Sequence, residues 1–315
     1  MVFYPKMERK NTSNKNLYGG TKMIVELNLV LAETSEAFRI EFARMCETPE
    51  VLAELAKDSS TSVVVEVAQN SFTQEDVLLK LARTSDATIQ QALVRNPCKS
   101  KYPKVIRALV LSEYQVVRME MAENTADQDI LEFLSKDCST NVRQKVAANP
   151  ATSIKTICKL VYDKEEGVRL TIAKLKELKQ EVRQKLSEDS SYLVRMTIAG
   201  RSDLSKEELQ KIATFEKNAM VLKMVARNSN TDATVLELLA RKTQDVWKEV
   251  AENPNTSEKT LSTLVKAQSV DVLLAVIKNK NTSESTLETL RKHEDYLVGK
   301  QAGYYLHERF LNPKV

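Results

Sequence analysis

The sequence is poor in glycine, proline and aromatic residues. Its 315 residues include only 6 glycines and 7 prolines, and aromatic residues make up 5%. Sandwiches and barrels consist of many short strands joined by turns that are rich in glycine and proline. The composition therefore argues against these folds and favours an all-α fold.

Metal-binding and disulfide patterns are also lacking. The four cysteines are Cys46, Cys98, Cys138 and Cys158, and the two histidines are His293 and His307. They form neither a C-x-x-C pair nor a mixed Cys/His cluster, the patterns typical of zinc and iron–sulfur sites. We therefore predict no metal and no cofactor. Scattered, unpaired cysteines are typical of a reducing compartment, so a cytoplasmic location is expected.

Most of the chain lacks an excess of basic residues. The formal net charge is +4, and residues 1–22, with five basic residues and one acidic residue, account for all of it. The other 293 residues hold 42 basic and 42 acidic side chains. A protein that binds phosphates along its length normally has a stronger basic excess. Residues 1–22 are polar and rich in Asn and Lys. We predict a disordered tail there, followed by a single repeat domain at 23–315.

Long hydrophobic runs are absent as well. The longest apolar window near the start, 23–32, is short and contains Glu26. A membrane-spanning helix needs about 20 mostly apolar residues. We therefore expect no membrane segment and no secretory signal.

The sequence does contain an internal repeat. VAANPATS at 146–153 recurs as VAENPNTS at 250–257. Apolar anchors follow one another at intervals of 25 to 28 residues, at Phe38, Val63, Ile89, Val117, Val142, Val168, Val194, Val221, Val246, Val272 and Val298. A second series, from Val30 to Leu290 and including Leu238, precedes the first by eight residues. So constant a period predicts a solenoid.

Each repeat contains two short segments whose apolar residues fall four apart. Val51 and Leu55 show this spacing in a first segment, and Val142 and Val146 in a second segment, where the small Ala147 follows. This spacing places the apolar residues on one face of a helix. Neither helix can bury its face alone, so the repeats must stack. We predict an all-α solenoid of ten to eleven repeats of about 26 residues, each an α/α or an α/3₁₀ pair.

An asparagine ends the second segment of most repeats, at Asn70, Asn96, Asn124, Asn149, Asn228, Asn253 and Asn279. Asparagine tolerates the left-handed conformation that closes helices, and proline often follows. Ser or Thr comes next and can cap the following helix, as in the capping-box pattern of Ser205 and Glu208. We interpret these asparagines as structural caps, each worth about 1 kcal/mol, with Asn149→Ala as the test. A ligand-binding ladder is the alternative.

The pattern L-x-x-L-x-x-D-x-x-x-x-V-R-x-x-V-A-x-N-P-x-T is best kept at 130–152, ILEFLSKDCSTNVRQKVAANPAT. It resembles the repeat of the leucine-rich repeat variant family, which is related to HEAT-like arrays, over nearly the whole chain from about residue 23. The resemblance implies an α-solenoid in a right-handed superhelix, with alternating α and 3₁₀ helices in some members. The repeat here is slightly longer than is usual for the family, which is compatible with α/α pairs. The family implies no reaction, and the cysteine-rich iron–sulfur segment of some members has no counterpart here.

An arginine row follows the anchors, at Arg118, Arg143, Arg169 and Arg195. Stacked repeats would align these residues, and the row could bind phosphates or an acidic peptide. Alternatively, the row forms a structural ladder with the aspartates that lie five residues before the anchors, at Asp58, Asp137, Asp163 and Asp189. We expect the structural role for Arg143 and Arg169, paired with Asp137 and Asp163. Ser112 takes the aspartate's place before Arg118, so Arg118 is the better binding candidate.

The same row becomes apolar at Leu222, Trp247 and Leu273. These residues either form an amphipathic groove beside the arginines or pack locally in the interior. The asparagine rule fails at Leu175 and Arg201, and residues 174–189 have the composition of a charged helix without a stop. We therefore expect a longer helix or an altered twist there.

Catalytic patterns are lacking, so we predict no catalytic residue and no enzymatic activity. The sequence favours a monomeric binding scaffold that presents an extended concave surface to a protein or peptide. The alternative is a nucleic-acid-binding or DNA base-repair array of the HEAT-like type, for which Asp245 near Trp247 is the best available pair. HEAT-type bilin lyases are a further enzyme class, but no motif points to them.

Overall fold

The structure is a computed structural model that describes residues 33–311. No described residue lies in a strand. The predicted tail at 1–22 and the anchor Val30 fall outside the described residues. The helices are α2 (Glu36–Met45), α3 (Pro49–Leu55), α4 (Thr61–Gln69), α5 (Glu75–Leu81), α6 (Ala87–Val94), α7 (Pro103–Val110), α8 (Gln115–Asn124), α9 (Gln128–Leu134), α10 (Thr140–Ala148), α11 (Ile154–Leu160), α12 (Glu166–Ala173), α13 (Gln180–Ser187), α14 (Tyr192–Ala199), α15 (Lys206–Phe215), α16 (Ala219–Arg227), α17 (Ala233–Lys242), α18 (Trp247–Glu252), α19 (Glu258–Leu264), α20 (Val270–Lys278), α21 (Glu284–Arg291) and α22 (Tyr296–Leu311).

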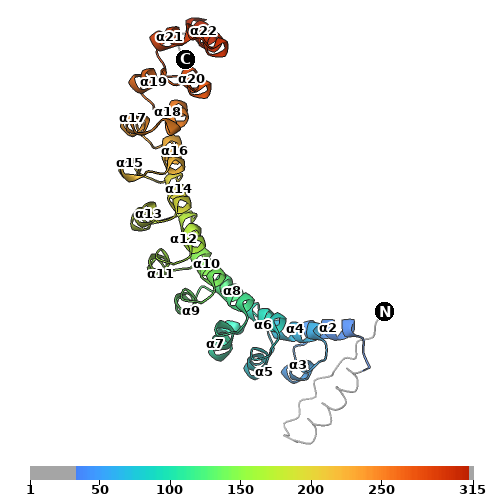
Figure 1. Cartoon of the computed structure of the whole chain (residues 1–315). Helices are drawn as coiled ribbons and strands as arrows, with labels where there is room; N and C mark the ends of the chain where they lie inside the picture. Colours follow the sequence, from blue (N-terminus) through green and yellow to red (C-terminus); the bar gives the residue numbers. More distant parts are fainter. Residues whose placement is uncertain (1–32, 312–315) are drawn as a thin grey trace, which may run out of the picture. The chain divides into compact units, whose positions relative to one another are not determined.

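The chain divides into two compact units, unit 1 up to Ala151 and unit 2 from Thr152 onward. Within each unit the helices form two layers (Figure 1). The even-numbered helices, which carry the second segment of each repeat, pack on one another in one layer. The odd-numbered helices form the other layer. This arrangement confirms the predicted all-α solenoid of stacked helical pairs.

The second segments are α-helices, so the α/α alternative is the one that the structure has. Only two short 3₁₀ helices occur among the described residues, η1 (Lys99–Lys101) and η2 (Gln244–Val246). They precede α7 and α18, and neither of them takes the place of an α-helix in a repeat. None of the described helices combines the length and apolar character that crossing a membrane requires.

The anchors form the core between the layers. Those from Val63 to Val298 are at most 8% exposed, whereas Phe38 in the first described helix is 54% exposed. In the second series Leu238 is the exception, because it is 37% exposed while its neighbour Leu239 is fully buried. Helix α17 continues to Lys242 and η2 precedes α18, so the register shifts by one residue in this repeat.

Candidate functional site

The asparagine ladder joins each repeat to the one before it. Asn149 follows α10, and its Nδ2 donates to the main-chain oxygens of Ala122 at 2.6 Å and Thr125 at 2.9 Å. Its Oδ1 accepts from the N–H of Ala151 at 2.8 Å. The side chain therefore satisfies carbonyl groups at the end of α8, which the helix itself leaves without partners.

The same arrangement recurs at Asn70, Asn96, Asn228, Asn253 and Asn279. All of these side chains are buried, and their hydrogen-bonding groups are engaged within the chain. The left-handed conformation that we expected is wrong. Asn149 has φ −70° and ψ 121°, and no non-glycine residue in the described part of the chain has a positive φ. The extended backbone turns the amide toward the preceding repeat.

Asn124 departs from this pattern. It is exposed, and its Nδ2 bonds to the main-chain oxygen of Glu120 within its own helix, at 2.9 Å. It therefore does not connect two repeats, although the sequence placed it with the other asparagines.

A second asparagine ladder was missed by the sequence analysis. Asn230, Asn255 and Asn281 each donate to two main-chain oxygens of the preceding repeat. The threonine that follows each of them donates to the main-chain oxygen of a valine in the preceding helix. The signal in the sequence is N-x-N-T, which occurs at 228–231, 253–256 and 279–282.

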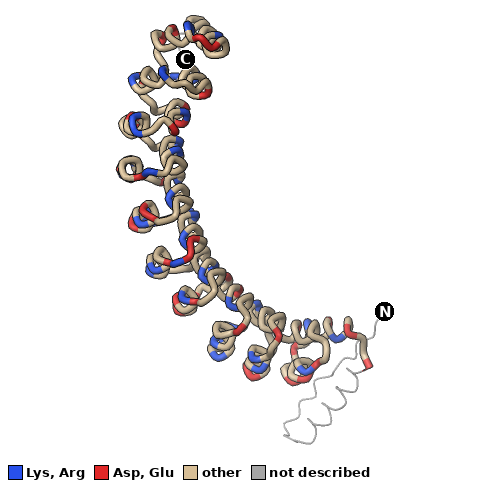
Figure 2. Tube along the Cα trace, viewed as in Figure 1, with Lys and Arg blue, Asp and Glu red and all other residues tan. Residues whose placement is uncertain are grey.

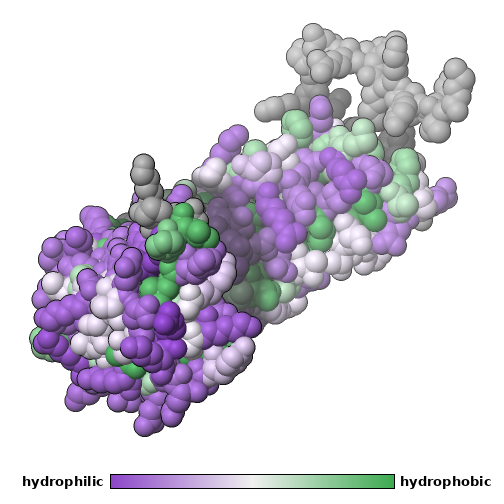
Figure 3. All heavy atoms as spheres, turned by 90° about the horizontal axis from the view of Figure 1, so that it is seen from above, coloured by the Kyte–Doolittle hydropathy of each residue, from purple (hydrophilic) through white to green (hydrophobic). Residues whose placement is uncertain are grey.

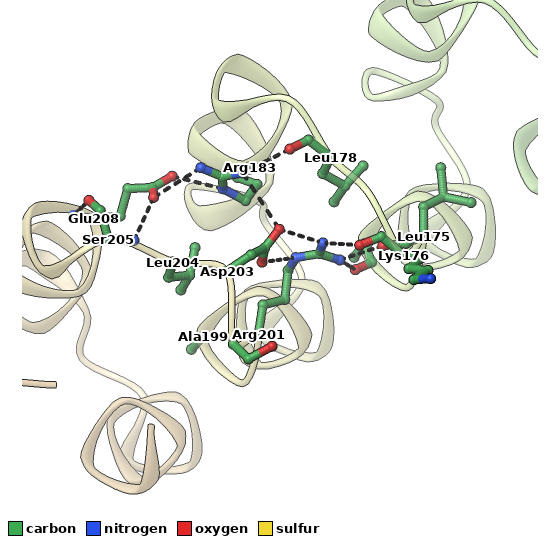
Figure 4. Close-up of polar contacts among 12 residues, drawn as sticks. Leu175, Lys176, Leu178, Arg183, Ala199, Arg201, Asp203, Leu204, Ser205 and Glu208 are labelled. Atoms are coloured by element: carbon green, nitrogen blue, oxygen red, sulfur yellow. Dashed lines mark hydrogen bonds and ion pairs between the residues drawn. The ribbon is translucent and has the colours of Figure 1, made fainter. Parts of the chain in front are cut away.

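Arg201 takes the place of the ladder asparagine between α12 and α14. Its Nη1 donates to the main-chain oxygens of Ala173 at 3.0 Å and Leu175 at 2.6 Å, and its Nη2 to that of Lys176 at 3.0 Å (Figure 4). Of the two alternatives expected at 174–189, the longer helix is wrong, because α12 ends at Ala173 and α13 begins at Gln180. The guanidinium supplies the donors that this helix end needs.

The charges around Arg201 are paired with one another. Asp203 bonds to Arg201 at 2.8 Å and lies 3.6 Å from Arg183, which also bonds to Glu208 at 3.0 Å (Figure 4). The Glu208 side chain in turn accepts from the Ser205 N–H and completes the predicted capping box. The hydrogen bond and charge of Arg201 lower the pKa of Asp203. The network thus stabilises the junction of neighbouring repeats.

Arg118 has an acidic partner in the next repeat, so the expectation that it lacks one is wrong. Its Nε and Nη2 contact Asp137 at 2.7 and 3.1 Å, and its Nη1 donates to the main-chain oxygen of Ser112 at 2.7 Å. Its side chain is 12% exposed. Such a two-pronged contact fixes the guanidinium.

The other described pairs of this row also join neighbouring repeats. They are Arg39–Asp58, Arg169–Asp189 and Arg195–Glu216. The predicted pairing of Arg169 with the carboxylate of Asp163 in the same repeat is therefore wrong, since Arg169 donates to the main-chain oxygen of Asp163 instead. Arg143 is 6% exposed and likewise donates to the main-chain oxygen of Asp137. We call this row the arginine ladder.

Three ladder carboxylates, Asp58, Asp137 and Glu216, have pKa values below their ordinary range. Burial by itself raises the pKa of Asp137, but hydrogen bonds from Arg118 and the Ser139 N–H, with the Arg118 charge, outweigh it. The same balance lowers the pKa of Glu216 beside Arg195. A carboxyl group whose pKa is lower in the folded state stabilises the fold above its unfolded pKa. This contribution is lost as the pH falls toward the folded pKa.

We therefore expect the melting temperature to fall as the pH drops below about 4, the pKa region of unfolded carboxyl groups. Glu216→Gln should lower the melting temperature near neutral pH, because the charged pair with Arg195 is lost. The two proteins should converge in acid, where Glu216 itself is protonated. Circular dichroism melts across this pH range measure the effect. An equal difference between the two proteins at every pH would contradict it.

The apolar part of the row lies in the interior. Leu222 and Leu273 are 1% and 0% exposed, and Trp247 is 9% exposed with its Nε1 donating to the main-chain oxygen of Ala240. The row therefore presents no open apolar stripe in the described structure. Asp245 is exposed, whereas the Trp247 ring is packed, so the two side chains do not frame a common opening.

An exposed apolar surface is found elsewhere, on the outward side of α12, α14 and α16 in unit 2. We call it the methionine face, and it comprises Leu170, Tyr192, Leu193, Met196, Met220 and Met224. Met220 is 51% exposed, and the three helices pack side by side (Figure 1). The Met224 Cε lies 2.7 Å from the place that a Cβ on Gly200 would take. A side chain at Gly200 would therefore displace this methionine.

The even-numbered helices of unit 1 have a different outer surface. Ion pairs connect neighbouring helices there, between Arg44 and Glu66, Arg95 and Glu120, and Lys145 and Glu123. Figure 2 shows basic and acidic residues interspersed along the helices. Figure 3 shows one side of the molecule, where hydrophobic residues form separate groups within a mainly hydrophilic surface. The methionine face is thus a local feature, which the sequence analysis did not identify.

No protein-family model matches the chain, and neither does any curated protein. Among solved structures, a leucine-rich repeat variant with a novel repetitive structural motif matches with a TM-score of 0.56 and 20% identity, over 71% of this chain and 88% of the other. An engineered protein matches with a TM-score of 0.28 and 16% identity, over 93% and 99%. A designed armadillo repeat protein matches with a TM-score of 0.13 and 14% identity, over 91% and 98%. Of these three, only the first is similar enough to bear on the fold. The chain therefore has an all-α helical-repeat solenoid fold, similar to that of the leucine-rich repeat variant.

Proposed function

We propose that this protein is a binding scaffold whose methionine face contacts an apolar segment of a protein or peptide partner. The observation that carries the proposal is a group of six apolar side chains across three neighbouring helices, of which Tyr192 and Met220 are exposed and the other four are half-buried. Exposed apolar surfaces that cross several elements mark interaction sites more often than scattered apolar residues do. Lys174, which follows α12, and Lys223, which holds on α16 the position of Met196 on α14, would remain in contact with water.

Methionine suits such a surface because its side chain is unbranched and polarisable. Met196, Met220 and Met224 can change rotamer and adapt to partners of different shape. A small number of buried apolar anchors supplies most of the binding free energy at protein interfaces. The three methionines are the candidates for that role.

The ladders support a binding function rather than a reaction. Their arginines and asparagines form hydrogen bonds between neighbouring repeats. These bonds fix the spacing of the helices, so that a partner meets a surface of constant geometry. The proposal involves no catalytic residue and no cofactor. Binding of duplex DNA, the alternative, would depend steeply on salt because it releases counterions.

We expect Met196→Glu to weaken peptide binding about tenfold or more, since it places a charge at the centre of the apolar contact. The probes are peptides selected from a random phage-displayed library on the wild-type chain. Their affinity is measured by fluorescence anisotropy. Gln144→Glu is the matched control, because Gln144 holds the equivalent position on α10 in unit 1.

Circular dichroism melts establish that both variants are folded. Equal affinity of Met196→Glu and the wild type would contradict the proposal, and so would an equal loss in the Gln144→Glu control. Fluorescein-labelled duplex DNA is titrated in parallel at low and moderate salt. Tight, strongly salt-dependent binding of DNA without peptide binding would favour the alternative.

A further inference from the structure

A groove in unit 1 carries basic residues that no carboxylate within residues 33–311 neutralises. It has a volume of about 660 Å³ and lies between the end of α5, α6 and α7. Arg83, Lys104 and Arg107 line it and are exposed. No carboxylate in the described part of the chain forms an ion pair with any of the three. In Figure 2, α7 carries basic residues and no acidic ones.

A groove at the equivalent repeat position in unit 2 provides an internal comparison. It lies between the end of α13, α14 and α15, and its lining includes Arg195, Lys211, Glu188 and Glu216. Lys211 bonds to Glu188 at 3.0 Å, and Arg195 bonds to Glu216 at 2.6 Å. Lys211 and Arg195 are therefore neutralised by carboxylates of the chain itself, whereas Lys217, which also lines this groove, forms no ion pair within residues 33–311.

Substitutions at corresponding positions explain the difference. Gln90 and Ser112 in the first groove stand where Arg195 and Glu216 stand in the second. The Ser112 hydroxyl donates to Gln90, and Gln90 donates to the main-chain oxygen of Thr84 at 2.7 Å. A neutral pair thus satisfies the buried polar groups in place of the arginine ladder. Arg83 stands where Glu188 stands, so the acidic partner is replaced by a cation.

The sequence around this groove also has an excess of basic residues. Residues 83–107 contain six basic residues and one acidic residue, whereas the rest of the chain after residue 22 holds 36 basic and 41 acidic residues. Of the surplus cations, Arg95 is paired with Glu120. Glu113 is the only carboxylate among the groove residues, and it lies on the segment that leads into α8. Leu111, also in the lining, is 58% exposed.

We propose that this groove binds an acidic peptide segment, with Arg83, Lys104 and Arg107 contacting its carboxylates and Leu111 contacting an apolar side chain. Arginine matches the geometry of a carboxylate and can bind it through two hydrogen bonds. An isolated anion would not use the exposed leucine, whereas a peptide with acidic and apolar residues uses both. This inference rests on the proposed peptide-binding function and adds a second contact surface with a defined chemistry.

The test uses a short fluorescein-labelled peptide that is rich in glutamate and has a central leucine. Its affinity is measured by fluorescence anisotropy with the full chain. Arg107→Ala should weaken binding about fivefold, as expected for an exposed charge contact, and Lys104→Ala in the same chain should weaken it further. Lys211→Ala is the matched control, because Lys211 holds the position of Arg107 in the second groove but is paired with Glu188.

The same peptide with glutamine in place of glutamate should bind weakly to all of these proteins. Equal binding of both peptides, or an equal loss in Lys211→Ala and Arg107→Ala, would overturn the inference. Tighter binding of a single-stranded oligodeoxythymidine than of the glutamate peptide would also overturn it, in favour of a phosphate ligand. Met196→Glu should leave binding of the glutamate peptide unchanged, and Arg107→Ala should leave binding of the library peptides unchanged. Failure at one surface is therefore distinguishable from failure at the other.

Discussion

Asn149→Ala is expected to lower the free energy of unfolding by about 3 kcal/mol, well above the 1 kcal/mol or so of an ordinary lost cap. The amide of Asn149 donates to the main-chain oxygens of Ala122 and Thr125 and accepts from the N–H of Ala151. Alanine leaves these three groups without their partner in a site that is 7% exposed. Each buried group that loses its hydrogen bond costs about 1 kcal/mol or more.

Asn124→Ala is the matched control for this change. Asn124 is exposed and bonds within its own helix, so its replacement should leave the free energy of unfolding nearly unchanged. Chemical denaturation of both variants measures the difference. If both variants lost a similar free energy of unfolding, the asparagine ladder would not stabilise the chain through contacts between repeats. A stable Asn149→Ala protein with reduced peptide binding would restore the ligand-binding interpretation.

Arg118→Ala is expected to destabilise the fold by about 3 kcal/mol, because it leaves Asp137 largely buried without its cation. The Asp137 side chain is 6% exposed, and its remaining hydrogen bonds come from main-chain N–H or thiol groups. Asp137→Ala should then cost little more in the Arg118→Ala background, since the pair is already broken. We expect a coupling energy of about 2 kcal/mol from the double-mutant cycle.

Arg44 and Glu41 provide the comparison pair. They also form an ion pair in unit 1, but their side chains are 53% and 59% exposed, so their coupling should be much weaker. Denaturant melts of the four proteins in each cycle supply the coupling energies. A coupling energy near zero for Arg118 and Asp137 would exclude a structural role for this ion pair. Unchanged stability of Arg118→Ala, with weaker binding of a partner, would make Arg118 a binding residue.

The sequence by itself determined the architecture of the chain. The spacing of the anchors predicted stacked helical pairs, because apolar residues four apart must face a neighbouring helix. The position of Asn149 at a helix end and the capping box of Ser205 and Glu208 were also predicted correctly. These features depend on residues that are close in the chain, so the local backbone geometry of a helix allows them to be predicted directly from the sequence pattern.

Only the tertiary structure decided which groups pair between repeats. Arg118 and Asp137 are 19 residues apart, and Arg169 and Asp189 are 20 apart. For Arg169 the sequence offered Asp163 in the same repeat, and only the register of the stacked helices selects Asp189 of the next repeat. Arg201 could not be identified as a substitute for asparagine, because its donors reach the helix end through a longer side chain.

The surfaces were likewise decided by packing. Leu222, Trp247 and Leu273 have the composition of a partner groove, yet stacking buries them, while Met196 and its neighbours remain outside. Arg83 and Arg107 form no ion pair with any described residue, and this became recognisable only by comparison with the groove at the equivalent position of another repeat, where Arg195 and Lys211 are paired. The physical reason is the same in each case. A periodic sequence fixes how each helix packs in its own repeat, whereas exposure and charge pairing depend on which side chains the neighbouring repeat brings into contact.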